Sequence, residues 1–131
     1  MRKTALLYLT IFFSSAVLHA QDEEKVFTKV PVEASTDVKL WATHIKKSTE
    51  LPDTVIKNIP PGTYTVKVQF IVDVHGSIGQ VKAKNDPGYG LAQQAINVIS
   101  TYKGKWQPAN QCGVKVKAYK EQPITFVIPP Q

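Results

Sequence analysis

Hydrophobic and polar residues alternate from Thr63 to Val74, a pattern typical of a strand that buries one face and exposes the other. Ile71 is the one apolar residue that falls on the polar face. The sequence Asp73-Val-His-Gly-Ser then predicts a tight turn, in which Gly76 can adopt a positive φ without steric cost. A second strand returns from Ile78 to Lys84, so this region predicts a β-hairpin. The apolar face of its first strand is formed by Tyr64, Val66, Val68, Phe70 and Val72.

Two segments show the 3.6-residue apolar period of amphipathic helices. The clearer one follows Asp86-Pro87, a typical helix start, and is expected to end at Gly104. The other begins at Asp37, whose side chain can cap free backbone N–H groups, and reaches about Lys47. We therefore expect one helix before the hairpin and one after it. Their apolar stripes are Val38, Trp41 and Ile45 in the first helix, and Leu91, Ala95, Val98, Ile99 and Tyr102 in the second.

A second alternation near the carboxyl end predicts a closing strand in two parts, interrupted by Glu121-Gln-Pro. Pro123 cannot donate a hydrogen bond to a neighbouring strand, so this strand is expected at an edge of the sheet. The pattern as a whole predicts three strands and two helices, and the apolar stripe of the second helix is expected to lie on the sheet. The first part of the closing strand turns Val114, Val116 and Ala118 inward and Lys115, Lys117 and Tyr119 outward, and the second buries Ile124, Phe126 and Ile128.

The first twenty residues read as a secretory signal peptide, with Arg2 and Lys3 before an apolar run that ends at Leu18. The run is 14 residues long, whereas a membrane-spanning helix needs roughly 20. We expect residues 1–20 to be removed, residues 21–34 to be an extended lead, and residues 35–131 to form one domain. The protein would then be periplasmic. The alternative is an uncleaved anchor in the inner membrane, with the domain facing the periplasm.

The charge and cysteine content bear on which partners and cross-links the protein could have. The chain has 16 basic and 10 acidic residues, and removal of the two basic residues of the signal peptide leaves 14 against 10. No arginine remains after residue 20, and proteins that read bases or clamp phosphates rely on arginine, so we expect no nucleic-acid partner. Cys112 is the only cysteine, which leaves either a small loop residue or a free thiol open to an intermolecular bridge.

Residue types that serve in catalysis and metal binding are present, but their spacing does not match that of known catalytic or metal sites. His44 and His75 each lack a second ligand at metal spacing, so no metal site is expected. Asp73, His75 and Ser77 lie within one turn and cannot converge as a catalytic triad, whereas Asp-x-x-Gly is ordinary turn chemistry. The sequence Gly88-Tyr-Gly90 lacks the third glycine of a dinucleotide-binding loop. We therefore expect neither an enzyme nor a bound cofactor.

The order of strand, turn, strand, helix, Trp-x-Pro loop and strand resembles the C-terminal domain of the TonB family. The similarity extends from about Leu51 to Ile128. It implies an α+β fold, a small antiparallel three-stranded sheet with two helices packed on one face. The elements follow the order ββαβ after an N-terminal helix, as in TonB and TolA C-terminal domains, which agrees with the pattern described above. The residues that carry the structural motif are Gly62, Gly76, Trp106, Pro108 and Gly113.

The resemblance implies a periplasmic interaction module that supports transmembrane transport. Such domains bind a short extended segment, the TonB box, of TonB-dependent receptors in the outer membrane by adding it as a strand to a sheet edge. Here we expect the closing strand to supply that edge. The partner-binding residues would be Val114, Lys115, Val116, Lys117, Ala118, Tyr119, Ile124, Thr125, Phe126 and Val127.

The sequence departs from a full transducer of the family, which has an inner-membrane helix and a Pro-rich spacer. Ser15-x-x-x-His19 echoes the pattern of transducer membrane helices, but it ends the apolar run directly before charged residues. Contact with the motor proteins ExbB and ExbD is expected only if the N-terminus is retained as an anchor. The alternative function is a stand-alone periplasmic scaffold or dimerisation domain of the same fold, and a homodimer is open at this stage.

Overall fold

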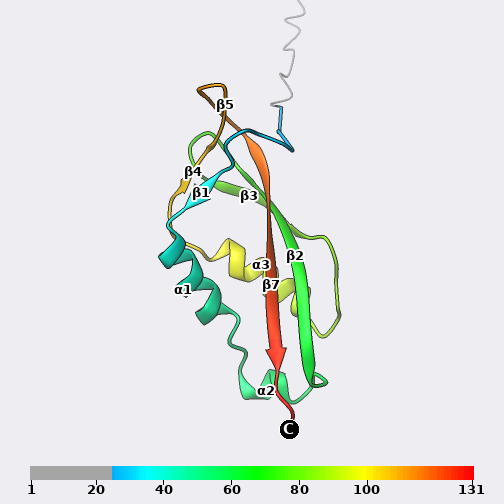
Figure 1. The fold of residues 1–131 in the computed structure, drawn as a ribbon. Helices are drawn as coiled ribbons and strands as arrows, with labels where there is room; N and C mark the ends of the chain where they lie inside the picture. The colour runs from blue at the N-terminus through cyan, green and yellow to red at the C-terminus, as the bar shows by residue number, and fades with distance from the viewer. Residues whose placement is uncertain (1–24) are drawn as a thin grey trace, which may run out of the picture.

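The computed structural model describes residues 25–131, and the predicted signal peptide and residues 21–24 lie outside that range. Its centre is an antiparallel sheet of three strands in the order β3-β2-β7, with β2 between the other two (Figure 1). The predicted α+β fold is confirmed. The strands are β2 (Gly62–Val72), β3 (Ile78–Ala83) and β7 (Ala118–Ile128).

The two long strands, β2 and β7, pair along their whole length without a register shift, from Gly62 opposite Ile128 to Val72 opposite Ala118. The alternation that predicted β2 also decides which side chains are buried, and all members of its apolar face except half-buried Tyr64 are fully enclosed. Ile71 is the exception on the opposite face, where we expected exposure. It is 2% exposed, and lies at the end of the sheet where Phe27 bridges Ala118.

The predicted closing strand was wrong in its first part. Val114–Val116 forms β6, which pairs with β5 (Ala109–Gln111) in a separate hairpin. The reason is the pair Cys112 and Gly113, whose φ values of 52° and 84° make a two-residue turn of the kind that favours hairpins. The predicted interruption at Glu121-Gln-Pro was also wrong, because β7 runs through Pro123 as one strand.

Strand β3 contains a bulge, which explains its irregular apolar pattern. Its register with β2 shifts between Gln69 and Ile71, and Gln80 has a φ of 48°. Two residues of β3 therefore oppose one residue of β2 at this point. The extra residue brings Ile78 and Val81 to the same face, where both pack against the core.

The helices cover one face of the sheet (Figure 1). Helix α1 (Val38–Ser48) begins as predicted, with the Asp37 side chain accepting a hydrogen bond from the backbone N–H of Leu40 at 2.9 Å. A short helix, α2 (Asp53–Ile56), precedes β2. Within the described residues, no helix is long and apolar enough to cross a membrane.

Helix α3 (Leu91–Ser100) buries Leu91, Ala95, Val98 and Ile99, four of the five residues predicted for its stripe. It starts later than predicted, because the Asp86 side chain accepts a hydrogen bond from the N–H of Gly88 and so forms a turn before the helix. It also ends at Ser100 and does not reach Gly104.

The segment before α1 packs on the domain. Val32 exchanges two backbone hydrogen bonds with Asn110, and Ala34 is buried. Strand β1 (Ser35–Thr36) then pairs with β4 (Trp106–Gln107). The domain boundary at residue 35 stays a prediction, but residues 25–34 are in contact with the rest of the fold.

Candidate functional site

The outer side of β7 is the candidate site, since β7 is the last strand on its side of the sheet. The N–H of Tyr119 points away from β2, because it donates to the carbonyl of Phe27 at 2.9 Å. Backbone groups of an antiparallel strand point to alternate sides, and the pairing with β2 has no shift. Residues 121, 123, 125 and 127 therefore also point outward. We call the outward backbone groups of residues 117 to 127 the β7 edge.

Most of the β7 edge is unpaired. No partner is recorded within residues 25–131 for the outward N–H groups of Glu121, Thr125 and Val127. Pro123 occupies an outward position, so its missing N–H removes no bond to β2. Its carbonyl accepts a hydrogen bond from Nε2 of the neighbouring Gln122 at 3.0 Å. The edge thus offers three donors to an added strand.

The side chains of β7 divide between the two faces of the sheet. Ile124, Phe126 and Ile128 are buried in the core and hold the strand in place. Thr125 and Val127 are exposed on the open face, and Val127 is 70% exposed. An added strand would therefore meet the backbone of β7 together with these two side chains.

A cross-strand ion pair lies on the same open face. Nζ of Lys84, just after β3, is 2.8 Å from Oε2 of Glu121 on β7. This hydrogen bond lowers the pKa of Glu121 below its ordinary value, with further attraction from the charges of Lys84 and Lys67. Glu121 is therefore ionised near neutral pH, and it is the one acidic side chain on β7.

An aromatic cluster fixes α1 beside β7. The rings of Trp41 and Trp106 meet edge to face with centroids 5.2 Å apart, and Trp106 meets Phe70 of β2 at 5.4 Å. Nε1 of Trp41 donates to Oε1 of Gln122 at 3.1 Å. Because this bond reaches the core side of β7, α1 is held near the strand while the outward N–H groups stay open. Trp106 is 4% exposed, so its ring is part of the core.

A groove runs between the end of α1, α2 and β7. Its volume is about 360 Å³. It adjoins the outward N–H groups of Thr125 and Val127, so a strand added there would place alternate side chains in it. The groove is lined by Lys46, Thr49, Glu50, Leu51, Ile56, Thr125 and Val127.

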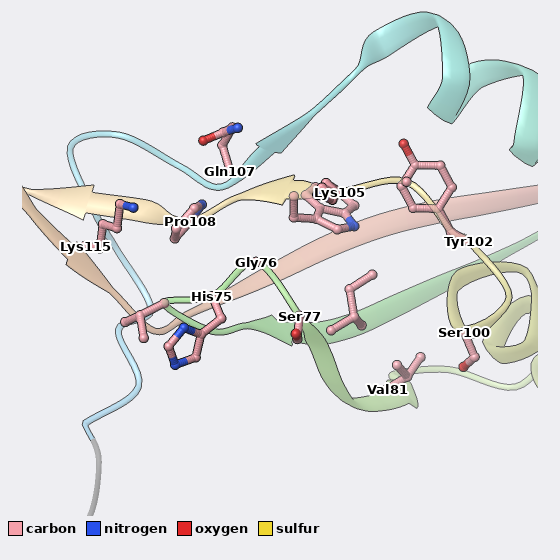
Figure 2. A pocket seen from close by; sticks show the side chains of 14 residues that line it. His75, Gly76, Ser77, Val81, Ser100, Tyr102, Lys105, Gln107, Pro108 and Lys115 are labelled. Atoms are coloured by element: carbon pink, nitrogen blue, oxygen red, sulfur yellow. The ribbon is translucent and has the colours of Figure 1, made fainter.

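A larger hollow lies elsewhere, between the turn after β2 and the Trp106–Pro108 segment, with a volume of about 820 Å³ (Figure 2). His75 and Ser77 line it from the turn, and Lys105 and Lys115 from the opposite side. Oδ1 of Asp73 accepts the backbone N–H groups of both His75 and Ser77 at 2.9 Å, so these residues form a turn, as predicted, and no triad. In the described part of the chain, no group of three or more His, Cys, Asp or Glu residues could hold a metal ion.

The family model for the Gram-negative bacterial TonB protein C-terminal matches residues 64–128. Residues 64–128 are a TonB C-terminal domain. The match starts inside β2 and ends at the last residue of β7. Neither the curated proteins nor the solved structures gave a match.

Membership of the TonB C-terminal family confirms two expectations at the level of the family: TonB C-terminal domains are periplasmic, and the family is that of a non-enzymatic transducer. It also suggests a TonB-like role in energy transduction for transport. The family also implies interaction with TonB-dependent receptors.

The TonB C-terminal domain places the predicted binding residues in three settings. Val114, Lys115 and Val116 lie in the β5–β6 hairpin and do not belong to the β7 edge. Lys117 and Tyr119 are on the edge, where Phe27 already pairs with them. Ala118, Ile124 and Phe126 point into the core, whereas Thr125 and Val127 are exposed at the open part of the edge.

Sequence reasoning missed two parts of this site. Glu121 and Gln122 were read as an interruption, although the alternation of buried residues from Ala118 to Ile128 continues through them. Pairing between Phe27 and β7 had no local signal, because it joins residues 91 positions apart.

The other predicted motif residues have structural roles. Gly76 has a φ of 80° and Gly113 a φ of 84°, both at turns, as expected for glycine. Pro108 is half-buried between β4 and β5, and Gly62 starts β2 opposite Ile128. These residues shape the scaffold that presents β7.

Proposed function

We propose that this TonB C-terminal domain binds an extended segment of an outer-membrane transporter, the TonB box, as an added strand on the β7 edge. Strand addition derives affinity from backbone hydrogen bonds and selectivity from alternate side chains. The observation that supports the proposal is the set of outward, unpaired N–H groups of Glu121, Thr125 and Val127 on an outermost strand. Through this binding the domain would serve TonB-dependent uptake.

The β7 edge is better suited to this role than the opposite edge of the sheet. Strand β3 has 6 residues and a bulge, whereas β7 has 11 residues without a register shift. A bulge disrupts the regular spacing of donors and acceptors that an added strand needs. The groove beside Thr125 and Val127 also gives β7 a place for side chains of the partner.

A titration of a TonB-box peptide into the protein, followed by amide chemical shifts, tests the proposal. We expect the largest shifts at Glu121, Thr125 and Val127, with small shifts in β3. If the largest shifts fall on β3 or on the β5–β6 hairpin, the assignment of the edge is refuted. If millimolar peptide causes no shifts, the proposed function is refuted.

The variant Thr125→Pro removes one outward donor of the edge and leaves the bonds to β2 in place. Each backbone hydrogen bond contributes about 0.5–1.5 kcal/mol, and the proline ring also obstructs an added strand, so we expect peptide binding to be lost. Thr125→Val is the matched control, because it removes the same hydroxyl group, which lies 3.1 Å from Oγ1 of Thr65, but keeps the N–H. Unchanged binding by Thr125→Pro would contradict the proposed geometry.

A second copy of the chain is the competing occupant of the same edge. Two β7 strands could pair with each other, which would give the homodimer left open by the sequence. Exposed lysines and prolines at a sheet edge disfavour such self-pairing. Sedimentation at rising protein concentration distinguishes the two: a monomer throughout supports the receptor segment as the occupant, and a dimer whose interface shows the β7 shifts supports the scaffold role.

A further inference from the structure

The β7 edge already has an occupant from its own chain. The N–H of Phe27 donates to the carbonyl of Lys117, and the carbonyl of Phe27 accepts from the N–H of Tyr119, both at 2.9 Å. The two strands run parallel at this bridge. The side chains of Phe27 and Val30 also pack against the core. We call residues 25–30 the N-terminal segment.

The N-terminal segment leaves β7 directly after this bridge. Val32 pairs with Asn110 on β5, so the chain diverges from β7 within a few residues. A hollow of about 270 Å³ opens at the fork, between Thr28 and Glu33 on one side and Tyr119 and Glu121 on the other. The fork divides the β7 edge into a closed part at residues 117–119 and an open part at residues 121–127.

The attachment of the N-terminal segment is shallow compared with the other strand pairings. Strands β2 and β7 pair over eleven residues, whereas the segment joins β7 by one bridge with two hydrogen bonds. One nearby ion pair joins Nζ of Lys120, whose side chain is 23% exposed, to Oε2 of Glu33, whose side chain is 79% exposed, at 3.4 Å. A pair with one well-exposed partner at this distance adds little. Release of the segment would break this bridge and the core contacts of Phe27 and Val30, but none of the eleven residue pairs between β2 and β7.

We propose that the N-terminal segment is an internal competitor for the β7 edge, which a partner strand must displace in order to pair along the whole edge. The proposal rests on the proposed function, because it assumes that a partner binds β7 as a strand. The physical reason is that one N–H group carries one proton, so Tyr119 cannot donate fully to Phe27 and to a partner at the same time. A short partner strand would use the open part alone.

The variant Phe27→Pro removes the N–H that bonds to Lys117 and so releases the segment. Thr28→Pro is the matched control: it places a proline one position further along, where the N–H has no recorded partner among residues 25–131. Hydrogen exchange at the Tyr119 amide monitors the segment directly. We expect the amide to be protected in the wild type and in Thr28→Pro, and to exchange faster in Phe27→Pro.

Two peptides then measure competition in the three full-length proteins. The first is a TonB-box peptide with flanking residues, long enough to span residues 117–127. We expect Phe27→Pro to bind it about tenfold more tightly than the wild type, because two hydrogen bonds no longer have to be broken. The second is a synthetic peptide with the sequence of residues 25–31, which should shift the Tyr119 amide of Phe27→Pro and leave that of Thr28→Pro unchanged.

The two peptides separate this proposal from the proposed function. Equal affinity of Phe27→Pro and Thr28→Pro for the TonB-box peptide, with Tyr119 protection lost in the former, overturns the competition while strand binding stands. If none of the three proteins binds the TonB-box peptide, the proposed function fails, and the peptide of residues 25–31 still tests whether the segment binds β7. A shift of the Tyr119 amide in Phe27→Pro alone supports the segment as the occupant of the closed part of the edge. No shift in either variant overturns that assignment.

Discussion

The close approach of the turn after β2 to the backbone of β4 at Trp106 can be tested by substitution of Gly76. A Cβ added at Gly76, which has a φ of 80°, would lie 2.2 Å from the backbone oxygen of Trp106. Gly88 has a similar φ of 89°, but a Cβ there meets nothing within 4 Å. The variants Gly76→Ala and Gly88→Ala therefore share the backbone strain and differ in the contact.

The structure sets the size of the expected difference. A residue other than glycine in the left-handed region costs about 1–2 kcal/mol, and this applies to both variants. At Gly76 the contact must also widen from 2.2 Å to at least 3.4 Å, which displaces backbone because no flexible side chain is involved. Such overpacking costs about 1–3 kcal/mol. We expect Gly76→Ala to lower the free energy of unfolding by about 2–5 kcal/mol, and Gly88→Ala by about 1–2 kcal/mol.

Urea unfolding followed by tryptophan fluorescence measures both variants, since Trp41 and Trp106 are the two tryptophans and lie in one cluster. We expect the unfolding free energy to fall with urea concentration at the same slope in both variants, so the midpoints of the unfolding curves report the difference in stability directly. Equal losses in the two variants would refute the argument, because they would mean that the approach of Gly76 to Trp106 carries no cost of its own.

Two further predictions concern β7. Phe126→Ala should lower the free energy of unfolding by about 3–5 kcal/mol because the ring is buried. Val127→Ala, at the exposed neighbouring position, should change it by less than about 0.5 kcal/mol. Similar losses in the two variants would show that β7 is not oriented as described. Lys84→Met should raise the pKa of Glu121, measured by NMR titration of its side chain. Because folding lowers this pKa, the ion pair stabilises the fold above the ordinary pKa of glutamate, and that contribution disappears as the pH falls through the lowered value; an unchanged pKa in the variant would contradict the pairing.

The sequence was sufficient where one local rule dominates. Strand β2 was predicted because apolar and polar residues alternate along it with one exception, Ile71, as is typical of a half-buried strand. Asp37 was identified as a helix cap because it directly precedes an apolar stripe of helical spacing. The edge position of β7 followed from Pro123, since a proline in a central strand would leave a neighbour unpaired. Each of these inferences needs only residues close together in the chain.

The sequence was insufficient where contacts between distant residues decide. The valines of Val114–Val116 fit either the closing strand or a hairpin, and the conformation of Cys112, with its φ of 52°, decided for the hairpin. The bridge from Phe27 to β7 depends on how the N-terminal segment folds back. No local pattern in the sequence indicates such a contact, so the closed part of the β7 edge became visible only in three dimensions.

The uninterrupted ladder between β2 and β7 has a mechanical consequence. A force that pulls on a strand bound to β7, along the strand axis, would load the residue pairs from Gly62–Ile128 to Val72–Ala118 in shear, all at once. The force needed to separate the strands would then grow with the number of paired residues. A force perpendicular to the strands would instead separate the pairs one after another. The geometry therefore favours an attachment that resists force along the β7 axis and separates more easily under force perpendicular to it.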